Sequence, residues 1–326
     1  MATSGTVATT VIDTSAVIEH AFRRCKVPAA QQTPETVLIA KENLYMLLLN
    51  LGNRGLNLWA VERKLVGLNQ GQLTYTTPAG TLDVLNVIYT QPTLVSSTFS
   101  TTANGGKASF STAYAARVGV RFSASYTGTL TISTSTDDVV YVTQVTATSA
   151  TYATGETYWF DVPTVNDAAY VLVEGAVAPV SNILVASALY DLPLSQWNRD
   201  TYLSINNKTQ QSRPSTTYFF EKKLTPTITL WPVPNNSNDH LTLMVHRQPQ
   251  DVGSLTQQLE LPQRWLDGFI WLLAARLCFE LPKEVVAMDV AQMVVQMADK
   301  QVFEAEQAES DGAPIYLTPG IGVYTR

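Results

Sequence analysis

Charged residues and cysteines are scarce in this chain of 326 residues. Lys, Arg, Asp and Glu make up 15% of it, cysteines number 2 and histidines number 3. Cys25 and Cys278 lie far apart, and no Cys and His residues have the close spacing of zinc ligands. The sequence therefore excludes a disulfide-rich secreted domain and a zinc module. Because Cys278 lies in an apolar helical run, we expect it to be a buried thiol.

Basic clusters are missing as well, since the basic doublets are confined to Arg23-Arg24, Arg63-Lys64 and Lys222-Lys223. The net charge of the chain is -6. Proteins whose main task is nucleic-acid binding neutralise phosphates with clustered Lys and Arg side chains. The acidic balance argues against that task, and each doublet is expected to lie on a solvated face.

No stretch of the sequence is long and apolar enough to span a membrane. The most apolar stretch, 37–51, is interrupted by Lys41, Glu42 and Asn43. Residues 1–7 lack the basic region and the apolar core of a signal peptide. We therefore expect no membrane association, and we expect the protein to stay in a bacterial cytoplasm after its synthesis.

Catalytic signatures are absent from the sequence. It has no Gly-x-Ser-x-Gly elbow, no phosphate-binding glycine loop, no HExxH and no dinucleotide fingerprint. Asp137 and Asp138 fit either a pair of calcium ligands or a solvated hairpin turn, and the turn is the stronger interpretation. His246 lies at the end of an expected strand without an identifiable acid or nucleophile as partner. The sequence thus predicts no enzyme, no cofactor, no metal and no catalytic residue.

Both ends of the chain show helical periodicity. Thr33 is suited to cap a helix and Pro34 to begin it, and apolar residues then recur at helical spacing until Gly52. A similar apolar stripe follows Pro262. The predicted helices cover residues 15–24, 34–51, 262–280 and 284–309.

The middle of the chain is rich in Thr, Ser, Val and Tyr, and apolar residues alternate with polar ones there. This alternation is typical of half-buried strands. The predicted strands cover residues 59–68, 72–76, 82–90, 117–125, 128–133, 139–147, 158–162, 170–174, 182–188, 216–221, 227–231 and 241–247. Many short strands separated by turn signals indicate a sandwich or jelly roll between about Pro92 and Ala188.

The sequence predicts an α+β fold, in which a helical bundle with a small β-sheet region carries an inserted all-β jelly-roll or sandwich domain. Residues 1–91 and 189–311 are expected to form one discontinuous domain, because both flanks of the β-rich block look like parts of a single domain. Residues 92–188 are the expected insertion, and residues 312–326 are an expected extended C-terminal arm.

The expected arm combines Pro and Gly residues with apolar side chains. A terminus that is merely flexible is normally polar, so apolar residues there suit docking on a partner or on the arm's own subunit. The candidate docking residues are Ile315, Tyr316, Leu317, Ile321, Val323 and Tyr324.

Aromatic side chains of the β-rich block are a second candidate for binding. A platform of rings can stack on sugars, although aromatic residues in strands more often pack in the core. The residues concerned are Tyr114, Tyr126, Tyr141, Tyr152, Tyr158 and Trp159.

A series of motifs resembles the adaptor proteins of short-tailed bacteriophages, which are also called tail tubular or head-to-tail connector proteins. The motifs are 192–195 (LPLS), 207–214 (NKTQQSRP), 228–234 (ITLWPVP), 261–267 (LPQRWLD) and the apolar helix 272–281. The Trp-Pro-x-Pro turn and the later Pro-x-Arg-Trp helix start are specific in combination. The resemblance covers roughly residues 10–90 and 190–326.

This resemblance implies a structural subunit of a phage virion. It implies a homo-oligomeric, usually dodecameric ring between portal and tail at the head–tail interface, with DNA passing through its lumen without sequence specificity. The other implied partners are the portal protein, on which the C-terminal arm docks, and tail nozzle or tail fibre proteins. Helices 262–280 and 284–309 are expected to line or flank the contacts within the ring.

The β-rich block resembles a discoidin-type, galactose-binding-like jelly roll, on the strand and turn of residues 131–137 (TISTSTD). Its ligand loops do not match, so the resemblance does not imply sugar binding. Two rival functions remain. One is a carbohydrate-binding tail or baseplate protein that attaches to host glycans through this block, and the other is a cell-wall hydrolase, against which the missing acid and base count.

Overall fold

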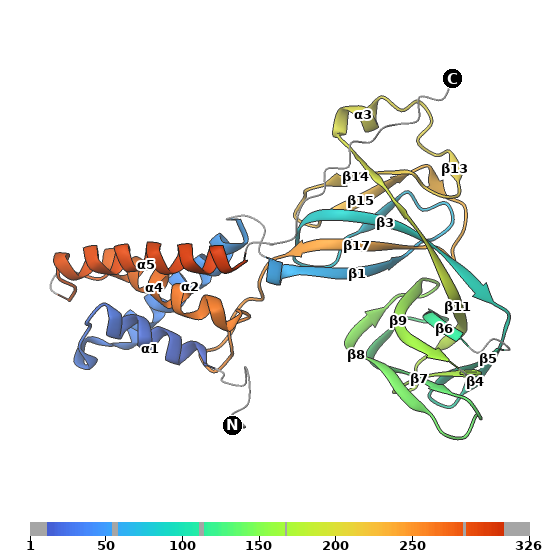
Figure 1. The fold of residues 1–326 in the computed structure, drawn as a ribbon, viewed down its shortest axis with the longest axis horizontal. Coiled ribbons are helices and arrows are strands. Elements are labelled where there is room, and N and C mark those ends of the chain that lie inside the picture. Colours follow the sequence, from blue (N-terminus) through green and yellow to red (C-terminus); the bar gives the residue numbers. More distant parts are fainter. Residues whose placement is uncertain (1–11, 54–57, 111–113, 167, 283–284, 310–326) are drawn as a thin grey trace, which may run out of the picture. The chain divides into compact units, whose positions relative to one another are not determined.

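The computed structural model describes residues 12–53, 58–110, 114–166, 168–282 and 285–309. The chain divides into two compact units, one made of residues 1–60 and 248–326 and the other of residues 61–247. The first unit is helical and the second consists mainly of strands (Figure 1).

The helical unit has four α-helices in its described part. They are α1 (Thr14–Arg24), α2 (Pro34–Asn53), α4 (Gln263–Glu280) and α5 (Met288–Glu309). Short 3-10 turns lie at Ala29–Gln31 and Leu58–Ala60. The helices predicted from periodicity at both ends of the chain are confirmed, with α5 starting later than residue 284. The helices α4 and α5 pack on each other as a C-terminal pair.

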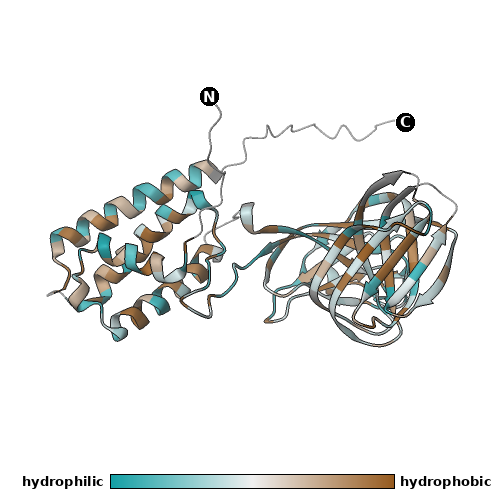
Figure 2. Ribbon diagram, turned by 90° about the horizontal axis from the view of Figure 1, so that it is seen from below, coloured by the Kyte–Doolittle hydropathy of each residue, from teal (hydrophilic) through white to brown (hydrophobic). Residues whose placement is uncertain are grey.

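Local sequence explains how these helices start and pack. The Thr33 hydroxyl accepts a hydrogen bond from the Thr36 amide at 3.3 Å, as a helix cap does. In α4, Phe269, Leu273 and Leu277 recur every fourth residue, are fully buried and share one core with residues of the other helices. Figure 2 shows hydrophobic residues along the helix faces that turn towards one another.

The second unit is built on a six-stranded sheet and a five-stranded sheet. The six-stranded sheet has the order β1 (Val61–Gly67), β17 (His240–Arg247), β3 (Thr81–Val95), β11 (Val180–Pro193), β6 (Tyr114–Phe122) and β9 (Thr157–Asn166). The five-stranded sheet has the order β4 (Ser97–Thr102), β5 (Gly105–Phe110), β10 (Tyr170–Gly175), β7 (Tyr126–Ser135) and β8 (Val142–Tyr152).

The five-stranded sheet packs on β11, β6 and β9 across one hydrophobic core, so the two layers form a β-sandwich of jelly-roll type. Alternation along the strands builds this core. In β10, Val171 and Val173 are fully buried in it, whereas Leu172 between them is half-buried on the other face.

A smaller four-stranded sheet covers another part of the same unit. Its order is β12 (Ser195–Trp197), β14 (Thr217–Glu221), β15 (Thr227–Trp231) and β2 (Thr74–Thr76). A second core joins it to β3 and β17, and the fully buried Tyr89, Ile228, Leu230 and Leu241 belong to this core. A two-stranded sheet of β13 (Gln211–Ser212) and β16 (Val233–Pro234), with the short helix α3 (Arg199–Leu203), completes the described part.

Two long strands connect the sandwich to the rest of the unit. Strands β3 and β11 are antiparallel partners whose ladder runs from Val95↔Val185 to Ile88↔Pro193. Within it, Pro92 pairs with Leu189 and Thr93 with Ala188, so the predicted ends of the inserted block lie on adjacent strands, one residue out of register. The compact units are instead divided after Ala60 and after Arg247. The domain boundaries at residues 92 and 188 therefore stay a prediction.

The predicted fold class is correct only in outline. The described chain is mostly β-sheet, with a sandwich-like jelly roll and a C-terminal helical pair, rather than a helical bundle with a small sheet region. Strands β4 and β5 were not predicted, because Ser97–Thr102 carries few apolar residues and β5 begins with two glycines. The predicted strands 82–90 and 182–188 were also too short, because β3 continues to Val95 and β11 to Pro193, past the expected boundaries at residues 92 and 188.

Candidate functional site

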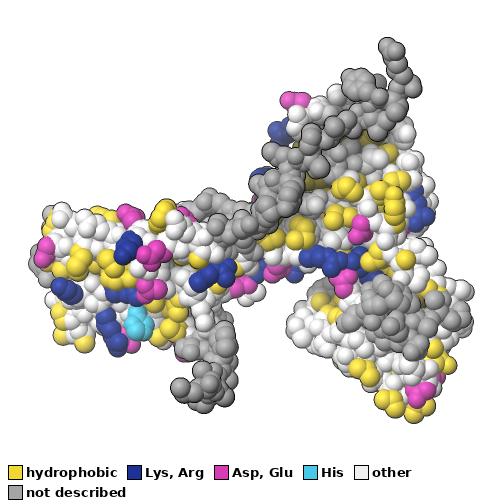
Figure 3. Space-filling model, in the orientation of Figure 1, with side chains coloured by type: hydrophobic (Ala, Val, Ile, Leu, Met, Phe, Trp, Pro, Cys, Tyr) yellow, Lys and Arg dark blue, Asp and Glu magenta, His cyan; other side chains and the backbone are white. Residues whose placement is uncertain are grey.

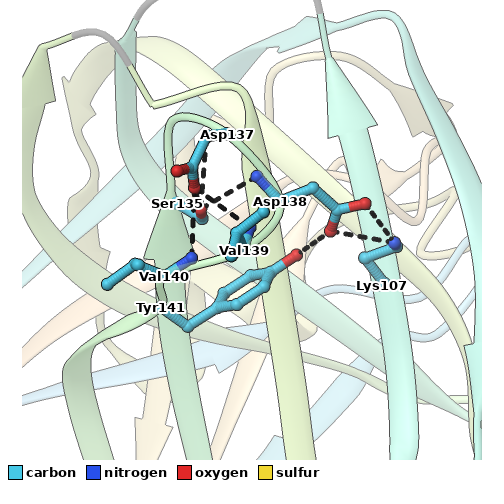
Figure 4. Close-up of polar contacts among 7 residues, drawn as sticks. All are labelled: Lys107, Ser135, Asp137, Asp138, Val139, Val140 and Tyr141. Atoms are coloured by element: carbon cyan, nitrogen blue, oxygen red, sulfur yellow. Dashed lines mark hydrogen bonds and ion pairs between the residues drawn. The ribbon is translucent and has the colours of Figure 1, made fainter.

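The turn between β7 and β8 is ordered by Asp137. Its carboxylate accepts hydrogen bonds from the Val139 amide at 3.0 Å, the Val140 amide at 3.1 Å and the Ser135 hydroxyl at 3.0 Å (Figure 4). These hydrogen bonds hold the pKa of Asp137 below its ordinary value. Asp138 has a φ of 65°, a left-handed conformation that Asp tolerates better than most residues. The hairpin-turn interpretation of this pair is confirmed.

The side chain of Asp138 forms an ion pair with Lys107 of strand β5. The Lys107 ammonium donates to both oxygens of the Asp138 carboxylate, at 2.9 and 2.7 Å, and the Tyr141 hydroxyl donates to one of them (Figure 4). The two donors lower the pKa of Asp138. Burial and the neighbouring carboxylate raise the pKa of Tyr141. At neutral pH Asp138 is therefore a carboxylate and Tyr141 a neutral phenol.

A shallow hollow of about 370 Å³ adjoins this cluster on the jelly roll. It is lined by Ser96, Thr98, Ser109, Phe110, Ala169 and Tyr170. The Lys107 ammonium lies 5.9 Å from the centroid of the Tyr170 ring, which lines the hollow. Lys107 and Asp138 keep 30% and 34% of their side chains exposed. The region offers hydroxyls, an aromatic ring and a charged pair to a polar ligand.

Asp137 and Asp138 have no third acidic or histidine side chain beside them, among the described residues, that would complete a calcium site. Among the described residues, no group of three or more His, Cys, Asp and Glu side chains could hold a metal ion. The oxygens of this turn are instead used by amides, a lysine and a tyrosine.

The aromatic residues of the jelly roll lie mainly in its core. The Phe122 ring stacks on those of Tyr152 and Tyr126, with centroids 4.8 and 6.1 Å apart, and meets Tyr158 edge-on at 6.0 Å. Tyr126, Tyr152 and Trp159 are buried. The prediction of a sugar-stacking platform is therefore wrong for Tyr126, Tyr152 and Trp159. The alternative, that aromatic rings in these strands pack in the core, is confirmed. Tyr141 alone belongs to the charged cluster, and the side chain of Tyr114 lies outside what the structure describes.

A buried ionic group lies beside the smaller core of the same unit. Asp239 is fully buried, and its carboxylate accepts two hydrogen bonds from the Arg213 guanidinium, both at 2.8 Å. The Tyr89 hydroxyl donates a third at 2.6 Å. Sequence patterns could not identify this group, because 150 residues separate Tyr89 from Asp239.

His240, next to Asp239, is also fully buried. One of its ring nitrogens contacts the Arg117 guanidinium, which is bound in turn to Asp161, and the Trp159 ring stacks on the imidazole at 4.8 Å. Burial, together with the positive charges of Arg117 and Arg63, lowers the pKa of His240 to about 2. The imidazole is therefore neutral and holds the strands together as a packed polar group.

This buried histidine predicts a loss of stability in mild acid. The unfolded chain takes up a proton near pH 6.5, whereas folded His240 does not, so the free energy of unfolding falls as pH falls below that value. The expected slope is about 1.4 kcal/mol per pH unit. Urea unfolding of His240→Gln between pH 6.5 and 4.5 should show a shallower slope than the native chain. His20→Gln, at an exposed position, is the control, and equal slopes in all three proteins would contradict the prediction.

His246 has an acidic neighbour that the sequence did not reveal. It pairs with Asp83 across the β17–β3 ladder, and the carboxylate raises its pKa. Burial lowers it by more, so the net shift is downwards. His246 is thus a second buried histidine whose pKa is lowered.

The helical unit leaves many large hydrophobic side chains exposed, and Figure 3 shows several along its surface. They are Leu38, Tyr45, Met46, Phe279, Met288, Met293 and Phe303. Next to Phe279, which is 76% exposed, a hollow of about 220 Å³ opens between α2 and α4. That volume is below the roughly 300–1,000 Å³ of small-molecule pockets.

The predicted docking residues of the C-terminal arm, 315–317, 321, 323 and 324, all lie outside the described residues. Their portal contacts therefore stay a prediction. No helix in the described part of the chain is long and apolar enough to cross a membrane.

Comparisons with known proteins add little. A scan against protein-family models finds no match to this chain, and a search of curated proteins finds none either. Among solved structures, the chain is similar to CBM32-3 from a family 31 glycoside hydrolase of Clostridium perfringens. The identity is 12%, the match covers 38% of this chain and 92% of that one, and the TM-score is 0.21. A likeness at this level carries no functional weight, so the jelly-roll description rests on sheet order and packing.

Proposed function

We propose that the protein is a structural head-to-tail adaptor of a tailed bacteriophage, a subunit of a dodecameric ring between portal and tail. The motifs between residues 192 and 281 suggest this family. The observation that carries the proposal is the exposed apolar surface of the helical unit. Phe279 and Phe303 of this unit are 76% and 59% exposed, and exposed apolar surface of this kind marks a protein interaction site where it is contiguous.

Each part of the molecule has a task in this proposal. The helical unit, with α1, α2, α4 and α5, contacts neighbouring subunits through heterologous contacts whose rotation closes a ring. The net charge of -6 favours a lumen that repels DNA phosphates, so that DNA slides through without binding. The C-terminal arm becomes ordered on the portal, which confines tight binding to the assembled site.

Phe279→Asp tests the proposed subunit contact. The side chain is 76% exposed, so the change should leave folding intact, whereas a charge in a subunit interface should prevent ring formation. Electron microscopy of the chain mixed with its portal should show rings for the native protein and none for the variant. Val139→Asp is the matched control, because Val139 is 79% exposed on the jelly roll and should still permit rings. Rings formed equally by Phe279→Asp would contradict the proposed contact.

A second candidate function is host attachment through glycans. The supporting observation is the hollow beside Lys107, Asp138 and Tyr170, where a sugar could stack on the ring and bind the charged pair through its hydroxyls. This function is compatible with the first, because the jelly roll and the helices belong to different units.

Lys107→Met should then weaken glycan binding at least tenfold in a glycan array followed by titration calorimetry, because a charge-assisted hydrogen bond contributes about 1.5–3 kcal/mol. Lys222→Met is the matched control, since Lys222 also pairs with a carboxylate, that of Asp83. An array on which the native chain binds no glycan would exclude this function and leave the adaptor proposal untouched.

A further inference from the structure

The fold brings the two cysteines of the chain into contact. The Sγ atoms of Cys25 and Cys278 are 3.5 Å apart, although 253 residues separate them in the sequence. Cys25 follows the last residue of α1, and Cys278 lies in the last turn of α4. Their exposed fractions are 1% and 9%, and both thiols are free. The sequence predicted the burial of Cys278 but not its partner.

The surrounding contacts hold these thiols face to face. At the start of α1, the Thr14 amide and hydroxyl donate to the Gln257 carbonyl at 3.0 and 2.6 Å. At its end, the Arg24 guanidinium pairs with Asp267 and lies 4.3 Å from the centroid of the Trp271 ring. Helix α1 is therefore fixed against the C-terminal segment at both ends. These contacts and the packing of the core set the distance between the sulfur atoms, and no disulfide bond is needed to bring them together.

We propose that Cys25 and Cys278 form a reversible disulfide that joins α1 to α4 when the protein meets an oxidising medium. A disulfide has a sulfur–sulfur distance of about 2.05 Å, so each sulfur must move by less than about 1 Å, which side-chain rotation can supply. In a bacterial cytoplasm the thiol pool keeps the pair reduced, and outside the cell it does not. The pair is thus a modification site that senses the redox compartment.

The reaction with a small disulfide such as oxidised glutathione is a double exchange. The Cys278 thiolate attacks one glutathione sulfur and releases the first glutathione thiolate, which leaves a mixed disulfide on Cys278. Cys25 loses its proton and attacks the Cys278 sulfur, releasing the second glutathione. Two protein thiols are oxidised, one glutathione disulfide is reduced, and the two protons leave with the two glutathiones.

The neighbourhood of the pair fits this order of events. Cys278 is the more exposed cysteine, so it meets the oxidant first. Burial raises the pKa of the Cys25 thiol, so Cys278 is the thiol that ionises more easily. The Cys25 thiol is in addition held by a hydrogen bond to the Ala274 carbonyl at 3.2 Å.

A disulfide here would change how the helical unit is held together. The unit is made of the chain segments 1–60 and 248–326, which are connected only through the whole second unit. In the reduced form, α1 is bound to the rest by packing and hydrogen bonds alone. The disulfide would prevent α1 from separating from α4 even when the second unit unfolds.

The test uses the full reduced chain incubated with oxidised glutathione. We expect both thiols to disappear, with an intact mass lower by two hydrogens, no bound glutathione and no dimer on a non-reducing gel. Dithiothreitol should restore both thiols. The oxidised chain should melt at a higher temperature than the reduced chain. Cys25→Ala and Cys278→Ala should each lack this shift and keep one thiol, free or carrying a single glutathione.

Three results would overturn the proposal. They are two glutathione adducts on one chain, disulfide-linked dimers as the main product, or thiols that stay free in the folded protein while they oxidise readily in urea. The urea sample shows that the reagent is active, so persistence of free thiols in the folded chain is decisive. None of these results depends on a portal or a ring, so the adaptor proposal is tested separately.

Discussion

Arg213→Met is expected to lower the free energy of unfolding by about 3–5 kcal/mol, because it leaves a buried carboxylate without its counter-charge. Asp239 is fully buried, and Arg213 supplies two of the three side-chain hydrogen bonds that its carboxylate accepts. After the substitution, only the Tyr89 hydroxyl remains to solvate the charge. Urea unfolding of the purified chain at neutral pH, followed by circular dichroism, measures the change.

The partners of Arg213 provide the controls. Arg213 itself is 39% exposed, so Asp239→Asn frees a cation that can turn to water, and it should cost less than Arg213→Met. Tyr89→Phe removes one hydrogen bond to a charged group and should cost about 1.5–3 kcal/mol. Adding Asp239→Asn to Arg213→Met should recover part of the loss. A cost below about 1 kcal/mol for Arg213→Met would place this group among weak surface ion pairs.

The double substitution Tyr316→Asp and Leu317→Asp is expected to weaken portal binding by about 100-fold or more. Burial of an aromatic or leucine side chain contributes about 1.5–3 kcal/mol, so two anchors account for about 3–6 kcal/mol. Each 1.4 kcal/mol is about a tenfold change in Kd. Surface plasmon resonance against immobilised portal rings measures the loss directly.

A control within the same arm separates anchoring from charge. Thr325→Asp adds a negative charge near the end of the chain but removes no apolar side chain, and it should bind the portal almost as well as the native protein. The thermal midpoint of each variant should be unchanged if the arm docks only on the portal. Native affinity in the double variant would refute arm docking.

The helices and most strands were predictable, because they follow from local periodicity. Phe269, Leu273 and Leu277 mark the buried stripe of α4, and Val171 and Val173 mark the alternation of β10. Strand β4 could not be predicted in this way, since Phe99 is the one large apolar residue among Ser and Thr. Such a strand forms because neighbouring β5 completes its hydrogen bonds.

The candidate sites were harder to predict than the elements. Asp137 and its turn could be located, because the turn is made by residues close in sequence. The partner of Asp138 could not, since Lys107 lies 31 residues away and on another strand. The contact of Cys25 with Cys278 depends on the packing of two helices from opposite ends of the chain. Long-range pairs of this kind are set by topology, which a single sequence does not show.

The pairing of β3 with β11 would allow the segment between these two strands to be removed or replaced by another domain. Because Gln91 lies opposite Tyr190, excision of residues 92–189 would leave two ends at the spacing of a β-hairpin. An Asn-Gly dipeptide could close them, since a two-residue turn matches that spacing. A foreign domain whose termini are adjacent could be spliced into the same gap. Either change would uncover His240, whose contacts with Arg117 and Trp159 would be lost, so water would hydrate the imidazole and its pKa would rise towards the ordinary value.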